Sequence, residues 1–284
     1  MTTLYLSDLD GTLLDPAARL PEEDAERINR MAAAGVKISF ATARTVRSVS
    51  SILRSVDFSL PGCAPVALMN GTMIRDMRAG RYLSVEKIPS DAALRVLGAL
   101  DSTGAEPFVY TVDEARPVMG DPLLTSYREL KNDAMRRFMD ERIERYGKPF
   151  LRFASPSELT GETVYFCVLG GEDLIRSSAV AAEGIPGIRL TYYRDAYRPE
   201  VWYLEIFSET ASKSRAAAFL RAFTGADRVV SFGDNRNDLP MFEASDVSVA
   251  VSSAQEEVRS AADAVCENVT EFILRDLAAQ GIRL

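Results

Sequence analysis

The chain has 284 residues, of which 47% are hydrophobic, and carries a formal net charge of −8 at neutral pH. This length permits two domains, and an acidic chain without a long basic run argues against a nucleic-acid partner. Histidine is absent, which excludes Ser-His-Asp and Cys-His catalysis and histidine-ligated metals. Proton transfer is therefore left to carboxylates, lysine, tyrosine or water.

The three cysteines, Cys63, Cys167 and Cys266, lie far apart in the sequence. Their spacing argues against a disulfide framework or a structural zinc site and favours reduced, buried thiols. Met1-Thr2-Thr3 leads directly into an apolar run rather than a signal peptide. Apolar stretches stay well below the roughly 20 residues of a membrane helix. We therefore expect a soluble cytoplasmic protein with no membrane partner.

The N-terminal third alternates between short apolar runs, which are typical of strands, and segments with helical periodicity. Pro21 suits the first turn of a helix, and Gly35 suits its C-terminal cap. The short connections between these segments imply parallel βαβ units. The predicted strands are 4–8, 36–41 and 65–69, and the predicted helices are 21–34 and 45–56.

The middle of the chain predicts a separate α+β module of about a hundred residues, a usual domain size. Its predicted strands are 82–88, 106–112, 116–119, 163–169 and 188–193, and its helices are 90–103, 121–146 and 172–183. The last third returns to α/β alternation, with strands 202–207, 228–232 and 247–251 and helices 212–223, 240–244, 254–262 and 269–280. The fold class is therefore α/β, with a Rossmann-like parallel-sheet core at 1–83 and 191–284 and an inserted domain at 84–190.

Two carboxylates mark the end of the first predicted strand. Asp8 and Asp10, within Asp-Leu-Asp-Gly-Thr, follow the apolar run Leu4-Tyr5-Leu6, and ligands of open α/β sheets bind at the carboxyl ends of strands. The two side chains share one side of an extended segment because side chains alternate with a period of two. One carboxylate could attack phosphorus or bind a cation while the other moves a proton, as magnesium-dependent phosphoryl transfer requires. The alternative is a strand followed by an aspartate-rich turn.

Other polar residues lie at the ends of predicted strands or at the start of a helix. Thr42, within Ala-Thr-Ala-Arg, could donate to a phosphate oxygen or only cap the following helix. Lys213 lies in the first turn of a helix, against the helix dipole, so it could neutralise a phosphate or carboxylates, or remain a solvated surface lysine. The run Gly-Asp-Asn-Arg-Asn-Asp at 233–238 could bind a hard cation through oxygen atoms or form a turn.

These motifs occur together and in an order that resembles the haloacid dehalogenase (HAD) superfamily. The Asn70-Gly71 pair, the stretch 233–241 and the long insertion between Thr42 and Lys213 are similar to its Cof-type sugar-phosphatase branch. The resemblance covers almost the whole chain, but in the inserted cap it is positional, so no substrate-binding residues are inferred there. Ala43 stands where the branch often has glycine, and its methyl group changes the close approach of this loop to a substrate.

The resemblance implies a role for each motif. Asp8 would be the nucleophile that forms an aspartyl-phosphate, and Asp10 the general acid for the leaving alcohol and then the base for water. The groups implied to bind the phosphoryl group are Thr42, Lys213 and Asn237. The ligands implied for Mg²⁺ are the carboxylate of Asp8, the main-chain carbonyl of Asp10, Asp234 and Asp238, the last directly or through water.

We therefore expect a Mg²⁺-dependent phosphatase that hydrolyses small phosphorylated metabolites through an aspartyl-phosphate. Sugar phosphates are the leading candidate substrates, and pyridoxal phosphate, flavin mononucleotide and phosphoglycerate-type esters are alternatives. The inserted domain would act as a lid that selects the substrate, and the protein would be a monomer or homodimer. Two other functions stay open: a phosphomutase of the same superfamily, and a non-catalytic sensor of phosphorylated metabolites.

Overall fold

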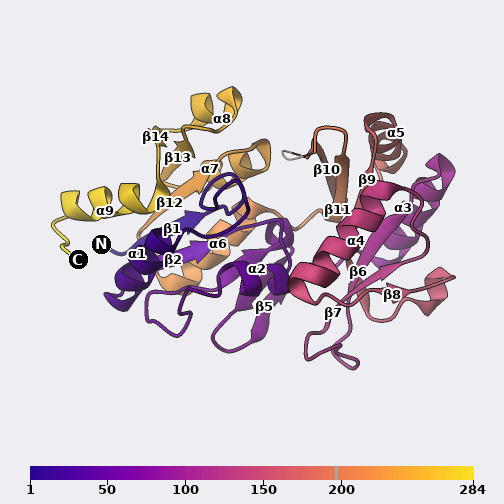
Figure 1. Cartoon of the computed structure of the whole chain (residues 1–284), viewed down its shortest axis with the longest axis horizontal. Helices are drawn as coiled ribbons and strands as arrows, with labels where there is room; N and C mark the ends of the chain where they lie inside the picture. Colours follow the sequence, from indigo (N-terminus) through magenta and orange to yellow (C-terminus); the bar gives the residue numbers. More distant parts are fainter. Residues whose placement is uncertain (196–197) are drawn as a thin grey trace. The chain divides into compact units, whose positions relative to one another are not determined.

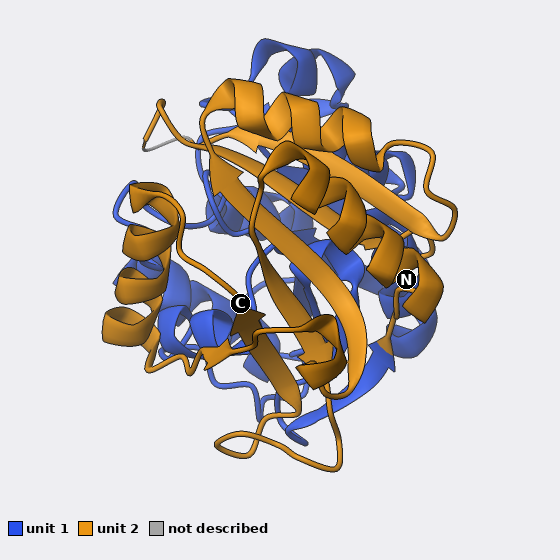
Figure 2. Cartoon of the chain, turned by 90° about the vertical axis from the view of Figure 1, so that its right-hand side faces the viewer, with its two compact units in different colours: residues 1–84, 212–284 blue, residues 85–211 orange. Residues whose placement is uncertain are grey.

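The computed structural model describes residues 1–195 and 198–284, which divide into two compact units. The first unit contains residues 1–84 and 212–284, and the second contains residues 85–211 (Figure 2). The sequence placed the second boundary at 190/191, but the unit ends at 211/212. The difference arises because β10 (Ile188–Arg194) and β11 (Trp202–Ser208) form an antiparallel pair, and β11 continues into the sheet of the second unit.

The first unit is built around a five-stranded parallel sheet with the order β14-β13-β12-β1-β2 (Figure 1). Every residue of β1 is buried, as expected for an apolar strand covered on both faces of a parallel sheet. This confirms the predicted α/β fold class. The strands are β1 (Thr3–Ser7), β2 (Lys37–Phe40), β12 (Arg228–Gly233), β13 (Val247–Val251) and the unpredicted β14 (Ala264–Cys266).

Helices of the first unit cover this sheet through apolar stripes. The helix α1 packs against α9 and β2, and α6 packs against β1, β12 and α7. Ile28 and Met31, three positions apart in α1, are both buried, which is the spacing of one helix face. The helices are α1 (Glu22–Ala33), α2 (Val46–Ile52), α6 (Lys213–Thr224), α7 (Leu239–Glu243), α8 (Glu256–Ala261) and α9 (Val269–Ala279), with 3-10 turns η1 (Met69–Gly71) and η3 (Arg236–Asp238).

A small antiparallel sheet follows the main sheet in the first unit. It consists of β3 (Val66–Leu68), β4 (Met73–Asp76) and β5 (Arg81–Val85), the last of which crosses the unit boundary. A single parallel bridge between Ala41 and Ala67 connects β3 to the end of β2. The third predicted strand is therefore present, but its main partner is an antiparallel neighbour that the sequence did not predict.

The second unit contains a six-stranded sheet with the order β10-β11-β9-β6-β7-β8. Helices α3 and α5 pack against each other, and their side chains share one core with Val109, Phe166 and Leu204 of the sheet. The remaining elements are α3 (Ser90–Thr103), β6 (Pro107–Val112), β7 (Leu123–Tyr127), α4 (Asp133–Tyr146), β8 (Leu151–Arg152), η2 (Pro156–Glu158), β9 (Glu162–Gly170) and α5 (Glu172–Ala182). This α+β composition confirms the expected inserted module.

Two predictions for the second unit are wrong. Residues 116–119 form no strand, and the predicted helix at 121–146 begins as the strand β7. The residues of β7 pair with β6 over Leu123 to Ser126, so tertiary pairing decides the conformation of this segment. The helix α4 begins only after Asn132, whose side chain accepts a hydrogen bond from the Met135 amide and caps it.

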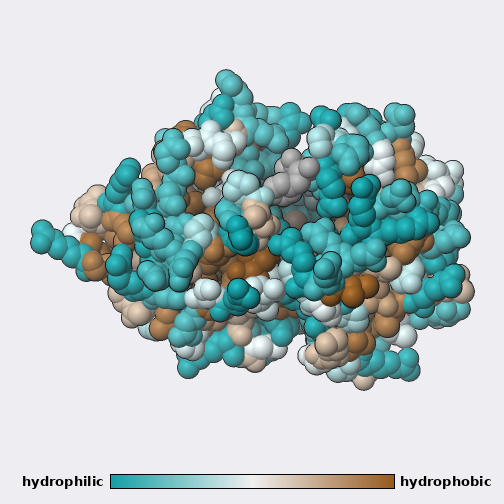
Figure 3. Space-filling model, in the orientation of Figure 1, coloured by the Kyte–Doolittle hydropathy of each residue, from teal (hydrophilic) through white to brown (hydrophobic). Residues whose placement is uncertain are grey.

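The face drawn in Figure 3 is covered mostly by hydrophilic residues, with hydrophobic residues in several separate patches. Exposed apolar residues of this scattered kind are ordinary on folded proteins. Within residues 1–195 and 198–284, each helix is too short or too polar to cross a bilayer.

Candidate active site

The carboxyl ends of three neighbouring strands bring the predicted site residues together. Asp8 directly follows β1, Asp234 directly follows β12, and Thr42 lies just beyond the end of β2. Ser7, the last residue of β1, is level with Phe40 of β2 and Phe232 of β12. The sequence predicted this convergence from the parallel arrangement of the strands, and the register confirms it.

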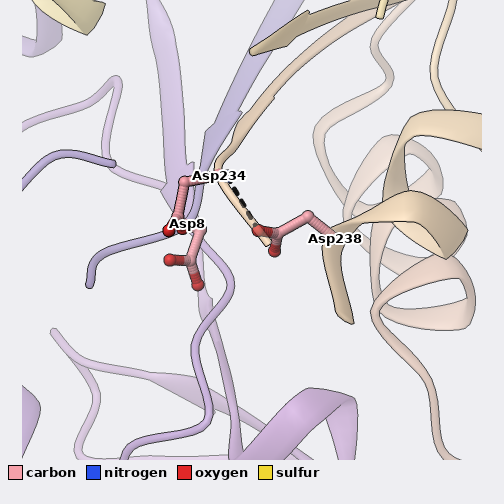
Figure 4. A group of neighbouring side chains, drawn as sticks. All are labelled: Asp8, Asp234 and Asp238. Carbon is pink, nitrogen blue, oxygen red and sulfur yellow. Dashed lines mark hydrogen bonds between the residues drawn. The ribbon is translucent and has the colours of Figure 1, made fainter. Parts of the chain in front are cut away.

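Three carboxylates form the centre of the site. One oxygen each from Asp8, Asp234 and Asp238 lies within 4.8 Å of the others (Figure 4). Asp238 is fully buried, and its Oδ2 accepts hydrogen bonds from the amides of Asp234 at 3.0 Å and Asn235 at 3.1 Å. The hydroxyl of Thr12 donates to Asp234 Oδ1 at 3.1 Å. Backbone and side-chain donors therefore fix Asp234 and Asp238 in place.

Two glycines make this close packing possible. A Cβ atom at Gly11, where φ is +75°, would lie 2.3 Å from Asp234 Oδ2. A Cβ atom at Gly233 would lie 2.5 Å from the Cβ of Asp238. Both distances are far inside van der Waals contact, so only glycine lets the chain pass these carboxylates.

Lys213 lies between two of the carboxylates. Its Nζ donates to Asp8 Oδ1 at 2.6 Å and to Asp238 Oδ1 at 2.6 Å, and the side chain is buried. The helix α6 begins at this residue after Ser212, which accepts a hydrogen bond from the Arg215 amide. A cation in the first helical turn opposes the helix dipole, and the two carboxylates explain its position there.

Burial and crowding perturb the titration of the cluster. Burial raises the pKa of Asp8 well above its ordinary value, against the lowering effect of Lys213 and with the repulsion of Asp238 and other carboxylates. Burial and then Asp238 raise the pKa of Asp234 to about 7. Burial alone would lower the pKa of Lys213, but Asp238 and Asp8 hold it above its ordinary value. Several carboxylates thus share one ammonium, and a further cation would relieve their repulsion.

The donor set of this cluster fits a hard cation. Carboxylate and carbonyl oxygens are the ligands that Mg²⁺ prefers, and Gly11 and Gly233 let the chain pass close to Asp234 and Asp238. Both oxygens of Asp238 already accept hydrogen bonds. Asp8 and Asp234 are therefore the stronger candidates for direct ligands, while Asp238 orients Lys213 and the loop after β12.

Asp10 lies outside this cluster and has a different partner. Arg44 Nε donates to Asp10 Oδ2 at 2.6 Å, and Arg44 Nη2 donates to Asp10 Oδ1 at 2.5 Å. This two-point pairing gives fixed geometry as well as charge compensation. Arg44 belongs to the Ala-Thr-Ala-Arg motif, but the motif alone predicts no role for it. The signal available was its place two residues after Thr42 in a loop at the same sheet edge.

Thr42, Asn70 and Asn237 lie together at the side of the site. Thr42 is buried, and its carbonyl accepts a hydrogen bond from the Asn70 amide at 3.0 Å. The amide group of Asn237 donates to Asn70 Oδ1 at 3.4 Å. Asn70 has φ of +57°, a conformation that asparagine tolerates better than most residues. The motif that supported the family resemblance therefore lies beside the predicted phosphate-binding residues.

The loop at Asn70-Gly71 also meets the start of α6. A Cβ atom at Gly71 would lie 2.2 Å from the carbonyl oxygen of Ser212. The loop that contains Thr42, the Asn70-Gly71 turn and the start of α6 are thus packed against one another. Six of the seven predicted residues, all except Asp10, belong to this connected group, and Asp10 is attached to it through Arg44.

A parallel sheet that gathers carboxylates and a buried lysine at its carboxyl edge, with an α+β insertion between its halves, defines a hydrolase of the HAD type. The sequence profile of the haloacid dehalogenase-like hydrolase family matches residues 5–272. The chain belongs to this family, which confirms the predicted superfamily and enzyme class.

Curated relatives cover nearly the whole chain. A 5-amino-6-(5-phospho-D-ribitylamino)uracil phosphatase of Bacillus subtilis is 24% identical over 89% of this chain and 88% of its own. A pyridoxal phosphate phosphatase of Escherichia coli is 25% identical over 96% of this chain and 97% of its own.

Solved structures share the fold of both units. A HAD phosphatase from Bacteroides thetaiotaomicron superposes with a TM-score of 0.72 at 20% identity, covering 100% of this chain and 96% of its own. A sugar phosphatase of HAD subclass IIB superposes with a TM-score of 0.71 at 20% identity over 100% of both chains. The two-part architecture expected from the Cof-type resemblance is therefore found among experimentally solved proteins.

Proposed function

We propose that this protein is a Mg²⁺-dependent phosphatase that hydrolyses small phosphorylated metabolites through an aspartyl-phosphate on Asp8. Sugar phosphates are the leading candidate substrates. Hydrolysis of phosphate esters follows from the family and its named relatives; the metal, the intermediate and the substrate class are the proposal. The observation that carries it is the buried Asp8 carboxylate at 2.6 Å from the Lys213 ammonium, beside Asp234 and Asp238.

Asp8 is the nucleophile in this proposal. Its carboxylate is buried at the end of the central strand β1, and the two-fold contact of Lys213 with Asp8 and Asp238 fixes one of its oxygens. The other oxygen attacks phosphorus, the bond to the leaving alcohol breaks, and the phosphoryl group is carried by Asp8. A preorganised buried carboxylate needs little rearrangement to reach this transition state.

The transferring phosphoryl group bears negative charge that the protein must balance in an acidic site. We assign its binding to Lys213, Thr42 and Asn237, which lie together around the Asn70-Gly71 turn. Mg²⁺, when bound by Asp8, the Asp10 carbonyl and Asp234 with support from Asp238, supplies further positive charge to the phosphoryl oxygens. Lys213 also offsets repulsion between Asp8 and Asp238 in the absence of substrate.

Asp10 moves the proton. It is the more exposed of the two N-terminal carboxylates, with 38% of its side chain accessible to solvent, whereas 8% of the Asp8 side chain is accessible. A partly exposed carboxylate can exchange its proton with water between turnovers. It protonates the leaving alcohol in the first step and accepts a proton from the attacking water in the second.

Substrate choice is assigned to the second unit. It is inserted between Thr42 and Lys213 in the sequence. Two curated relatives that align with most of this chain are phosphatases named for different substrates. The reactive group, a phosphate monoester, is common to these substrates. The leaving group therefore carries the differences that an enzyme of this kind must recognise.

The test is phosphate release from a panel of phosphorylated metabolites with and without Mg²⁺. Wild type releases phosphate only with the metal, and Asp8→Asn does not. Glu26→Gln is the matched control, because Glu26 is an exposed carboxylate on α1 of the same unit. Equal rates for wild type and Asp8→Asn would overturn the nucleophile assignment, whereas transfer to a second sugar position instead of water would identify a mutase. Binding without turnover would identify a sensor.

A further inference from the structure

The Asp10–Arg44 pair is the best-defined contact of the site that the family roles leave unexplained. Both carboxylate oxygens of Asp10 accept a hydrogen bond from the guanidinium, at 2.6 Å from Nε and 2.5 Å from Nη2. Asp10 and Arg44 are 34 residues apart, in the loops after β1 and β2. The pair therefore connects the loop of the proton carrier to the loop of Thr42.

Arg44 is itself held on several sides. Its Nη1 donates to the Ser48 hydroxyl of α2 at 3.0 Å, and its main-chain amide donates to Thr42 Oγ1 at 3.2 Å. Its carbonyl accepts a hydrogen bond from the Met69 amide at 3.1 Å. The main chain of Arg44 is thus fixed by the loop and its guanidinium by Ser48 of α2, so both ends of the side chain have contacts that do not involve Asp10.

Asp10 needs such support because a competing cation lies nearby. Asp10 is close enough to Asp8 and Asp234 for its charge to influence both. Asp8 contacts the Lys213 ammonium, and Asp8 and Asp234 both belong to the proposed Mg²⁺ site. A mobile Asp10 carboxylate would be drawn toward that positive charge. The planar fork of an arginine can hold both oxygens in one plane, which a lysine cannot do.

We propose that Arg44 is a positioning residue that holds the Asp10 carboxylate as the proton acceptor for hydrolysis of the aspartyl-phosphate. In that step the water oxygen bonds to phosphorus, the bond between phosphorus and Asp8 breaks, and one water proton passes to Asp10. A carboxylate has about four lone-pair positions, so the paired Asp10 keeps room to accept this proton. The inference rests on the proposed function.

The two chemical steps depend on this pair unequally. In the first step Asp10 gives a proton to the leaving group, and a good leaving group such as p-nitrophenolate needs little of this help. In the second step Asp10 must accept a proton from a water molecule whatever the substrate was. Loss of Arg44 therefore slows dephosphorylation of Asp8 more than its phosphorylation when p-nitrophenyl phosphate is the substrate.

The experiment is a rapid-mixing assay of Arg44→Gln with p-nitrophenyl phosphate and Mg²⁺. We expect a burst of p-nitrophenolate larger than in wild type, followed by a steady-state rate about 10²-fold lower. The acid-quenched protein carries more covalent phosphate than wild type. Arg44→Lys keeps the positive charge but lacks the planar guanidinium. Its burst and its loss of steady-state rate are smaller than those of Arg44→Gln. Asp10→Asn reproduces the behaviour of Arg44→Gln.

Arg54→Gln is the matched control, because it removes an arginine charge from an exposed position shortly after α2. It leaves both phases unchanged. The inference would be overturned by a steady-state rate of Arg44→Gln equal to that of wild type. It would also be overturned if both Arg44 variants lost steady-state rate without a burst and without covalent phosphate. Absence of turnover in wild type would overturn the proposed function itself, and the two failures are therefore distinguishable.

Discussion

Replacement of Lys213 by methionine tests the electrostatic balance of the site. The substitution keeps most of the length and apolar volume of the side chain but removes the ammonium between Asp8 and Asp238, which lie at 2.6 Å on either side. The side chains of Lys213 and Asp238 are 1% and 0% exposed, so water cannot replace the lost contact. Two buried carboxylates are left with no compensating cation.

The magnitude follows from this burial. Removing one partner of a buried ion pair costs about 3–5 kcal/mol, and partial protonation of Asp8, whose pKa is already raised by burial, favours the lower end. One kcal/mol corresponds to roughly 2–4 °C in a unit of this size. The melting temperature of metal-free Lys213→Met should therefore fall by roughly 6–20 °C, measured by calorimetry at neutral pH with a chelator present.

A double variant isolates the charge effect. In Lys213→Met/Asp238→Asn one of the two uncompensated carboxylates is replaced by an amide that still offers an oxygen to the Asp234 and Asn235 amides. Its melting temperature should lie above that of Lys213→Met. Additive losses from the two substitutions, or a loss below about 1 kcal/mol in the single variant, would refute the reasoning.

Two further predictions concern Asp234 and Asp10. The metal-free folded protein keeps a proton on Asp234 up to a pKa of about 7, whereas the unfolded chain loses it near pH 4, so the free energy of unfolding falls as pH rises between these values. The contribution of Asp234 is roughly 4 kcal/mol for a shift of about three pKa units. Denaturant unfolding with a chelator should show a steeper fall in wild type than in Asp234→Asn, which keeps the contribution of Asp8. Equal slopes in both proteins would contradict this prediction. The specificity constant of Asp10→Asn should fall more for alkyl phosphates than for p-nitrophenyl phosphate, because poor leaving groups need a proton. Equal losses with both substrates would exclude Asp10 as the acid.

The sequence predicted the sheet edge well because the rule behind it is geometric. Apolar runs of strand length with short helical connections imply parallel strands, and parallel strands place Asp8, Thr42 and Asp234 at one edge. Lys213 was recognised because a cation at the start of a helix is unfavourable without a partner. The individual roles of these residues stay predictions until they are tested by mutation.

Other features could not be predicted because they depend on tertiary contacts. The strand β7 begins the segment 121–146, which was predicted as one helix, and its pairing with β6 determines its conformation. The strand β11 was predicted as part of the core although it belongs to the second sheet. The Asp10–Arg44 pair depends on the conformation of two loops, which periodicity does not determine. No sequence pattern in 85–211 predicts which side chains meet a substrate.

The central claim is that Asp8 carries the phosphoryl group during turnover. The most direct measurement is acid quench of the Mg²⁺-loaded protein during hydrolysis of p-nitrophenyl phosphate, followed by borohydride reduction and peptide mass spectrometry. Asp10→Asn is run in parallel, because its slower hydrolysis step increases the amount of intermediate. We expect homoserine at position 8, dependent on substrate and absent from Asp8→Asn. Sustained phosphate release with position 8 unmodified in both proteins would contradict it.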